Sequence, residues 1–269
     1  MSIASGVGDG LGNGVSPAFL PNFKPTNISG CVLWLRADLG KTLNGSTVSQ
    51  WNDQSSSGNN ASQGTAANQP TDQPSDTPQA SLLFSVNATD TTLNRFNISD
   101  SVSLHSGTGS YHLWAVIRTP TTYPTTHSIH GPIFDKNTAS PWTGGVGDGF
   151  GLGINVVVGV GQPIVVFSGH TGTVNPGINT TTNTLYLLEY VYDGNGTHTI
   201  IINGVSTTAL SSSTVTTPGN NTLVIGTTAA GINRSFAGNI FEQGINIPAP
   251  LSIQRTQLQN YVRLRYGVG

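Results

Sequence analysis

The sequence predicts an all-β fold in which two antiparallel sheets pack face to face, and three observations support this class. Only 8% of the 269 residues are charged while 34 are glycine, a composition typical of strands and tight turns. From residue 31 onward, short β-branched or aromatic runs are separated by clusters of Gly, Asn and Pro, the pattern of a β-sandwich. Disordered chains combine low hydrophobicity with high net charge; this chain is 36% hydrophobic with a formal net charge of −2, so we expect it to fold.

The first 30 residues differ in composition from the rest. Glycine alternates with small residues there, and prolines follow at positions 17, 21 and 25. No pattern of side chains in this segment would bury one face of a core. We therefore predict an extended Gly/Pro-rich arm over residues 1–30, which stays flexible or becomes ordered on a neighbouring protein, and a β-sandwich over residues 31–269.

Nine segments have the length and composition of strands: 31–36, 82–86, 111–118, 150–158, 162–167, 185–192, 197–202, 205–210 and 222–226. Three of these segments, 185–192, 197–202 and 205–210, are separated by two tight turns. Asp193-Gly194-Asn195-Gly196 precedes 197–202, and Asn203-Gly204 precedes 205–210. Because Asn-Gly supplies the positive φ angles of a two-residue type I′ turn, these three strands are predicted to form a meander.

Two further segments complete the expected architecture. Residues 52–80 are polar and interrupted by three prolines, which predicts a long surface loop. A short C-terminal helix is predicted with Ser252 as its N-cap and Gly267 as its stop. Its apolar face would comprise Leu258, Tyr261 and Val262, with Arg263 and Arg265 in its last turn.

Composition also limits the partners and the cellular location. The ten basic residues are scattered singly, so no nucleic-acid or anionic-membrane partner is expected. Residues 1–6 lack the basic and apolar regions of a signal peptide, and no apolar run approaches a membrane span. The single cysteine, Cys31, excludes an internal disulfide and is interpreted as a buried structural thiol.

Several segments resemble, in order, the LamG-like, concanavalin A-like domains of bacterial and phage proteins. The resemblance begins in Val32–Asp38, Trp51–Ser55 and Gly58–Ala61 and continues through the strand Tyr111–Arg118. It extends through Ile133–Asp135, Gly149–Gly153, Leu187–Gly204, Leu223–Gly226, Gly238–Glu242 and Val262–Gly267. It thus covers residues 31–267, nearly everything except the arm.

This resemblance implies a jelly roll of two antiparallel sheets, in a family whose members mostly bind glycans or proteins. Small glycine-rich arms ahead of such a domain are similar to those of phage tail and head-decoration proteins. The implied function is that of a non-enzymatic virion structural or decoration protein of a bacteriophage particle. Its arm would dock on capsid or tail subunits, and its jelly roll would display a surface for cell-surface glycans.

Two alternatives stay open. One is a carbohydrate-binding lectin module of a tail fibre or receptor-binding protein, and the other is a glycan hydrolase with an unfamiliar site. A cyclic homo-oligomer fits a virion component, although the sequence has no coiled-coil heptad that would specify one.

The carboxylates argue against an enzyme. Glucanases of this fold carry paired carboxylates on one strand, whereas this chain has only two glutamates, Glu189 and Glu242. Glu189 and Asp193 share a strand face but lie about 13 Å apart along it. A retaining glycosidase needs about 5–5.5 Å between its carboxyl groups and an inverting one about 6.5–9.5 Å. No catalytic residue is therefore assigned.

Binding residues can be named only as candidates. A glycan would need an exposed aromatic ring, which Trp142 and Tyr123 could supply. Trp142 is equally compatible with a loop anchor. Trp34, Trp51 and Trp114 are predicted to be core residues. No cofactor is required by any motif. A calcium ion could be held by Asp38, Asp53, Asp135 and Asp148, although aspartates in such loops more often form turns. A zinc or nickel site at His127 and His130 is the weaker alternative to a solvated loop.

Overall fold

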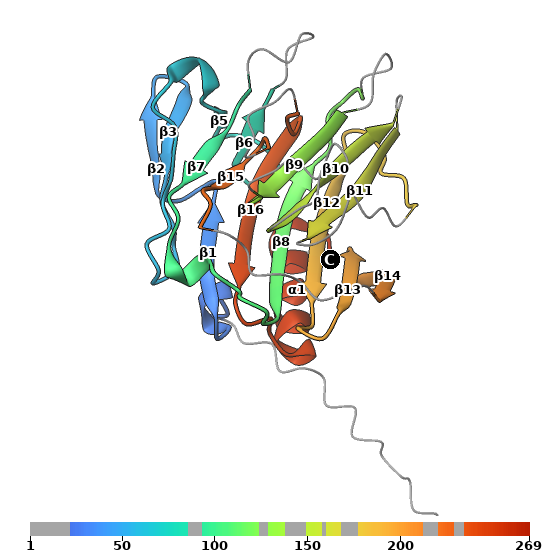
Figure 1. Cartoon of the computed structure of the whole chain (residues 1–269). Helices are drawn as coiled ribbons and strands as arrows, with labels where there is room; N and C mark the ends of the chain where they lie inside the picture. Colours follow the sequence, from blue (N-terminus) through green and yellow to red (C-terminus); the bar gives the residue numbers. More distant parts are fainter. Residues whose placement is uncertain are drawn as a thin grey trace, which may run out of the picture.

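The computed structural model confirms the predicted class: an antiparallel all-β sandwich with one C-terminal helix (Figure 1). It describes residues 22–85, 93–123, 129–137, 149–157, 160–167, 177–211, 220–228 and 234–269. The strands form one hydrogen-bonded path in the order β11-β10-β9-β15-β7-β4-β3-β5-β6-β16-β8-β12-β13-β14, with β1 added to β16 and β2 to β3.

One half of this path forms the sheet that carries the helix. Its strands are β6 (Ser81–Phe84), β1 (Cys31–Arg36), β16 (Gly238–Asn246), β8 (Tyr111–Arg118), β12 (Leu185–Tyr192), β13 (Thr197–Ile202) and β14 (Val205–Ser211). Strand β16 is central, because it pairs with β8 on one side and with both β1 and β6 on the other. Residues near the start and near the end of the chain therefore lie side by side.

The other half faces this sheet. Its strands are β11 (Val160–Phe167), β10 (Phe150–Val157), β9 (Ile129–Asp135), β15 (Leu223–Ile225), β7 (Phe96–Ile98), β4 (Ala61–Ser62), β3 (Thr47–Trp51), β2 (Lys41–Asn44) and β5 (Thr71–Gln73). Three short 3₁₀ turns accompany them: η1 (Pro25–Asn27), η2 (Ala66–Asn68) and η3 (Val102–Leu104).

Apolar side chains form two clusters, one on each face of the helix-bearing sheet. The sandwich interior contains fully buried aromatic residues from both sheets, including Trp51, Phe84, Phe96, Phe134 and Tyr190. The second cluster lies between α1 (Ser252–Tyr266) and the outer face of the same sheet; it includes Trp34, Trp114, Phe241, Leu258 and Val262. Because alternate side chains of one strand serve the two clusters, the helix-bearing sheet is apolar on both faces.

The local predictions for the meander are confirmed. Strands β1, β8, β12 and β13 have the predicted bounds. The turn between β13 and β14 has φ = 50° at Asn203 and φ = 78° at Gly204, and Ile202 pairs directly with Val205. This is the two-residue connection that Asn-Gly favours.

The expectation of a surface loop over residues 52–80 was wrong in part. The segment contains β4, η2 and β5, and Ala61 is fully buried. Some of its polar side chains are buried: Gln63 and Gln69 are 5% and 4% exposed. Gln69 Nε2 donates a hydrogen bond to the Gln63 carbonyl at 2.8 Å. Amides that satisfy backbone groups can be buried, so polarity alone did not indicate exposure.

The expected end of the arm at residue 30 also needs correction. Ile28 is only 2% exposed within the helix-side cluster, and the ring of Phe23 packs on Tyr261 with 5.9 Å between centroids. Residues 22–30 therefore belong to the folded body, and residues 1–21 of the predicted arm lie outside the described part. The helix begins as predicted within one residue: Leu251 is the N-cap, its amide donating to Gln254 Oε1 at 3.0 Å, and Gly267 ends the helix with φ = 76°.

Candidate functional site

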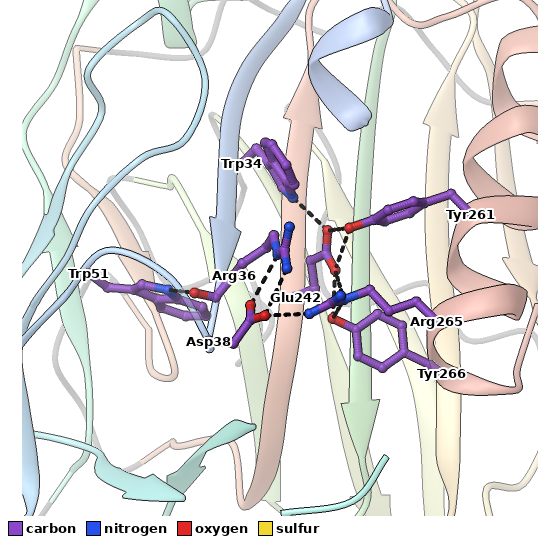
Figure 2. A network of polar contacts seen from close by, with 8 residues as sticks. All are labelled: Trp34, Arg36, Asp38, Trp51, Glu242, Tyr261, Arg265 and Tyr266. Atoms are coloured by element: carbon purple, nitrogen blue, oxygen red, sulfur yellow. Dashed lines mark hydrogen bonds and ion pairs between the residues drawn. The ribbon is translucent and has the colours of Figure 1, made fainter. Parts of the chain in front are cut away.

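Glu242 is the centre of a buried polar network between β1, β16 and α1 (Figure 2). The register of β16 shifts between Ile240 and Glu242, which directs the Glu242 side chain toward the helix. Its carboxylate is fully buried and accepts hydrogen bonds from Trp34 Nε1 at 2.6 Å, Tyr261 Oη at 2.9 Å and Tyr266 Oη at 2.5 Å. The first strand, the last strand and the helix are thus joined at one carboxyl group.

An ion-pair chain extends this network toward the surface. Arg265 Nε lies 3.5 Å from Glu242 Oε2, and Arg265 Nη2 lies 2.5 Å from Asp38 Oδ2. Arg36 Nη2 approaches the same Asp38 oxygen at 2.7 Å. Partial desolvation raises the pKa of Asp38, but the two arginines more than offset it, so the pKa lies below its ordinary value. Asp38 is therefore used to fix the end of the helix to β1.

The buried part of the network is structural rather than catalytic. Burial raises the pKa of Glu242 above its ordinary value, against the three donors that lower it. Burial and the neighbouring Glu242 carboxylate also raise the pKa of Tyr266. A raised carboxyl pKa is typical of general acids, but a side chain with no exposed surface cannot reach a glycosidic oxygen in this conformation.

Glu189, the only other glutamate of the sequence, is also buried beneath α1. Its Oε2 lies 3.0 Å from His112 Nε2, and its Oε1 accepts a hydrogen bond from Gln259 Nε2 at 2.7 Å. The Glu189 and His112 side chains are both fully buried. Asp193, its partner in the rejected pair, instead accepts the amides of Asn195 at 2.7 Å and Thr197 at 2.9 Å, as a turn-forming aspartate does.

The three calcium candidates that the structure describes, Asp38, Asp53 and Asp135, are not grouped as metal ligands. Asp53 accepts the Trp34 and Asn59 amides, each at 2.9 Å, and Asp135 accepts Asn137 Nδ2 at 2.6 Å. Asp38 is held by the arginines described above, and Asp148 lies outside the described residues. In the ranges that the structure describes, no three His, Cys, Asp or Glu side chains are grouped so that they could hold a metal.

The two aromatic candidates have different outcomes. Tyr123 is only 3% exposed, and its hydroxyl lies 2.7 Å from Thr180 Oγ1, so it does not present the exposed ring that glycan stacking requires. Trp142 and His127 lie outside the described residues, as does the side chain of His130. The three tryptophans predicted to be core are confirmed as buried: Trp34, Trp51 and Trp114.

A cluster of polar groups that sequence reasoning missed joins the segment between β7 and η3 to the residue after β9; it is called the rim below. Asp100 lies 2.7 Å from Lys136 Nζ and 2.9 Å from His105 Nε2. Lys136 is fully buried, whereas the Asp100 and His105 side chains are 27% and 26% exposed. Slight desolvation raises the pKa of Asp100, but the hydrogen bonds from Lys136 and His105 outweigh it, so the pKa is lowered and the carboxylate stays charged. Nearby Val102 is 84% exposed.

Cys31 does not offer a reactive thiol. Burial raises the pKa of the Cys31 thiol to about 12, with a further increase from Asp53, so the thiol stays protonated and unreactive. Among the described residues, no helix is long and apolar enough to cross a membrane.

No protein-family model and no curated protein sequence matches the chain. Solved structures do match. The binding domain of Paraclostridial Mosquitocidal Protein 1 is 12% identical with a TM-score of 0.58, over 86% of this chain and 52% of that one. The botulinum neurotoxin serotype G binding domain is 11% identical with a TM-score of 0.55, over 87% and 51% of the two chains. The binding domain of botulinum neurotoxin DC, solved in complex with SialylT, is 13% identical with a TM-score of 0.54, over 87% and 52%.

The chain spans about half the length of these binding domains. At such low identity the likeness establishes a shared fold only. It does not show that the matching half of the neurotoxin DC domain is the part that contacts SialylT. This chain therefore has a jelly-roll sandwich fold, with two antiparallel sheets and a C-terminal helix. About half of each of these toxin binding domains has the same fold.

Proposed function

We propose that this chain is a non-enzymatic recognition module that binds carbohydrate through the rim of its sandwich and is carried on a bacteriophage particle. One observation carries the non-enzymatic part: both glutamates are fully buried under α1 and bonded to neighbouring side chains. A hydrolase would need two carboxyl groups facing a substrate at a fixed separation. The fold shared with toxin binding domains supports a binding role.

The rim residues supply the chemistry that sugars need. Ionised Asp100 can accept hydrogen bonds from sugar hydroxyls, and His105 beside it can accept or donate one. Val102 offers exposed apolar surface for a sugar C–H face. Trp142 is the proposed stacking ring of this site. It belongs to the segment between Asn137 and Gly149, which are joined by a hydrogen bond from Gly149 N to Asn137 Oδ1 at 2.9 Å.

A glycan array probed with the full chain tests this proposal. Binding should be lost in Trp142→Ala and weakened in Asp100→Asn, because the first removes a stacking ring and the second an acceptor. Leu43→Ala is the matched control, since Leu43 is an exposed apolar residue on β2. Glycan binding unchanged in both rim variants would reject the rim as the site, and release of sugar from host polysaccharide would reject the non-enzymatic role.

Neither calcium nor another cofactor is part of the proposed site. The described aspartates among the candidate calcium ligands, Asp38, Asp53 and Asp135, accept hydrogen bonds from donors of the chain itself. We therefore expect glycan binding to persist in EDTA. Loss of binding in EDTA that is restored by calcium would show that a metal takes part.

The place on the particle is proposed from the sequence resemblance. The arm, shortened to residues 1–21 by the folded position of residues 22–30, would dock on a capsid or tail subunit, and a cyclic oligomer would fit such a site. Electron cryo-microscopy of the particle should show residues 1–21 against a neighbouring subunit. If the sandwich attaches to the particle without contact from this segment, the docking role is lost.

A further inference from the structure

The η3 turn of the rim is anchored to the body of the protein by Asn59, which is only 4% exposed. Asn59 Nδ2 donates to the Val32 carbonyl at 2.7 Å and to Ser103 Oγ at 2.9 Å. Ser101 Oγ donates to Asn59 Oδ1 at 2.8 Å. The two serines thus hold the turn to β1, while Val102 between them is 84% exposed. The rim is therefore in place before a ligand arrives, which lowers the entropic cost of binding.

The lysine of the rim is withdrawn from solvent. Its side chain, that of Lys136, is fully buried, and its ammonium group donates to Asp100 Oδ1 at 2.7 Å and to the Asn221 carbonyl at 2.6 Å. An anionic ligand cannot reach this ammonium group in this conformation. The Asp100 side chain, by contrast, is 27% exposed. The charge that a ligand meets at the rim is therefore the negative charge of Asp100.

The ring of His105 is oriented by the same carboxylate. Its Nε2 lies 2.9 Å from Asp100 Oδ1 and 3.0 Å from Asp100 Oδ2. An ionised carboxylate can only accept hydrogen bonds, so Nε2 is the donor, and in the neutral ring Nδ1 is then an acceptor. The rim thus combines hydrogen-bond acceptors with the apolar surface of Val102. Sugar hydroxyls are donors that suit such acceptors, and the C–H face of a sugar ring suits the apolar surface.

We infer that the rim binds uncharged sugars and discriminates against sugars that carry a carboxylate next to the hydroxyls that Asp100 accepts. The inference rests on the proposed carbohydrate binding and names the class of sugar. A ligand carboxylate would lie close to that of Asp100, and Lys136 is too deeply buried to pair with it. Two like charges brought together without a shared counter-ion oppose binding.

An array of matched glycan pairs tests this inference. The two members of each pair differ only in whether the terminal sugar is neutral or carboxylated, as glucose and glucuronic acid do. At mildly alkaline pH the full chain should bind the neutral members several-fold more tightly. Asp100→Asn should bring this ratio close to one, because the amide retains an acceptor oxygen but has no charge.

Salt provides a second measurement that needs no variant. The Debye length falls from about 10 Å at 0.1 M salt to about 3 Å at 1 M. The preference of the unsubstituted chain for neutral glycans should therefore decrease at the higher salt concentration. If Asp100→Asn does not fold, this salt dependence still tests the inference, and a preference that does not change with salt would contradict it.

Asp38→Asn is the matched control. It removes the same charge from an aspartate that is 30% exposed and lies beyond the far end of β1, where it is paired with Arg36 and Arg265. It should leave the ratio unchanged, and circular dichroism verifies that each variant is folded. A ratio that falls equally in Asp38→Asn would assign the preference to net charge and overturn the inference.

The array also separates this inference from the proposed function. If the unsubstituted chain binds carboxylated members as tightly as neutral ones, the inference is overturned while carbohydrate binding stands. If it binds no member of either class, the proposed function is rejected together with the inference.

Discussion

A carboxylate removed from water must find its donors inside the protein, and Glu242 finds one tryptophan and two tyrosines. Glu242→Ala would leave these three polar groups without their acceptor. We expect it to lower the free energy of unfolding by about 3–5 kcal/mol. Asp38→Asn, at the partly exposed end of the same network, should cost no more than about 1 kcal/mol. Urea unfolding of both variants measures the difference, and equal costs would contradict the assigned roles.

The same residue predicts a pH dependence. Burial raises the pKa of folded Glu242 above its ordinary value of 4.5. At a pH between the ordinary pKa of the unfolded chain and the raised pKa of the folded chain, folded Glu242 retains a proton that the unfolded chain has lost. The contribution of Glu242 to stability is therefore complete below the unfolded pKa and decreases as pH rises through the folded pKa. Glu242→Gln removes this titration. The unfolding free energy of the unsubstituted chain minus that of Glu242→Gln should therefore fall as pH rises through the mildly acid range; an increase would show that the sign is wrong.

At the scale of elements, the turn between β13 and β14 offers a sharp test. Gly204 has φ = 78°, a region that costs other L-residues about 1–2 kcal/mol. Gly204→Ala should lower stability by about that amount. Gly64→Ala is the control, because Gly64 has no positive φ and an added Cβ there would meet nothing within 4 Å. Thermal unfolding compares the two variants, and similar melting temperatures would argue against the type I′ turn.

The sequence predicts some elements much better than others. Strands β8, β12 and β13 are predominantly apolar or β-branched runs bounded by turn residues, so the sequence predicts their limits. Strands β2, β4 and β5 are two to four residues long and largely polar. Pairing with β3 and β6, rather than their own composition, holds them extended. Propensity carries little information for such short, partner-dependent strands.

The candidate site was harder to predict for a related reason. Trp34 and Glu242 are 208 positions apart, and nothing in either local sequence indicates that they meet. The sequence did identify the scarcity of glutamate and the unsuitable spacing of Glu189 and Asp193, but not that both glutamates would hold the helix. Tyr123 was misjudged because its phenol finds Thr180, a partner that only the fold brings near.

For the whole molecule, one sheet carries both apolar clusters, so neither cluster can be lost without the other. We expect a single unfolding transition. Trp51 reports on the sandwich interior, whereas Trp34 and Trp114 report on the helix side. Tryptophan fluorescence and far-ultraviolet circular dichroism should give coincident midpoints in Trp51→Phe/Trp142→Phe and in Trp34→Phe/Trp114→Phe/Trp142→Phe, in which the fourth tryptophan, Trp142, is also removed. Separate midpoints would mean that the helix side unfolds on its own.

The central position of β16 has a consequence for biosynthesis. Residues 238–246 fill the place between β8 and the pair formed by β1 and β6, and they emerge from the ribosome after every other strand of that sheet. Until then β1 lacks its partner, and one edge of β8 remains open to other chains. Such an edge is a template for misassembly. The nascent chain therefore cannot complete its sandwich during most of translation, which makes the interval before β16 emerges the period in which it depends most on protection by chaperones.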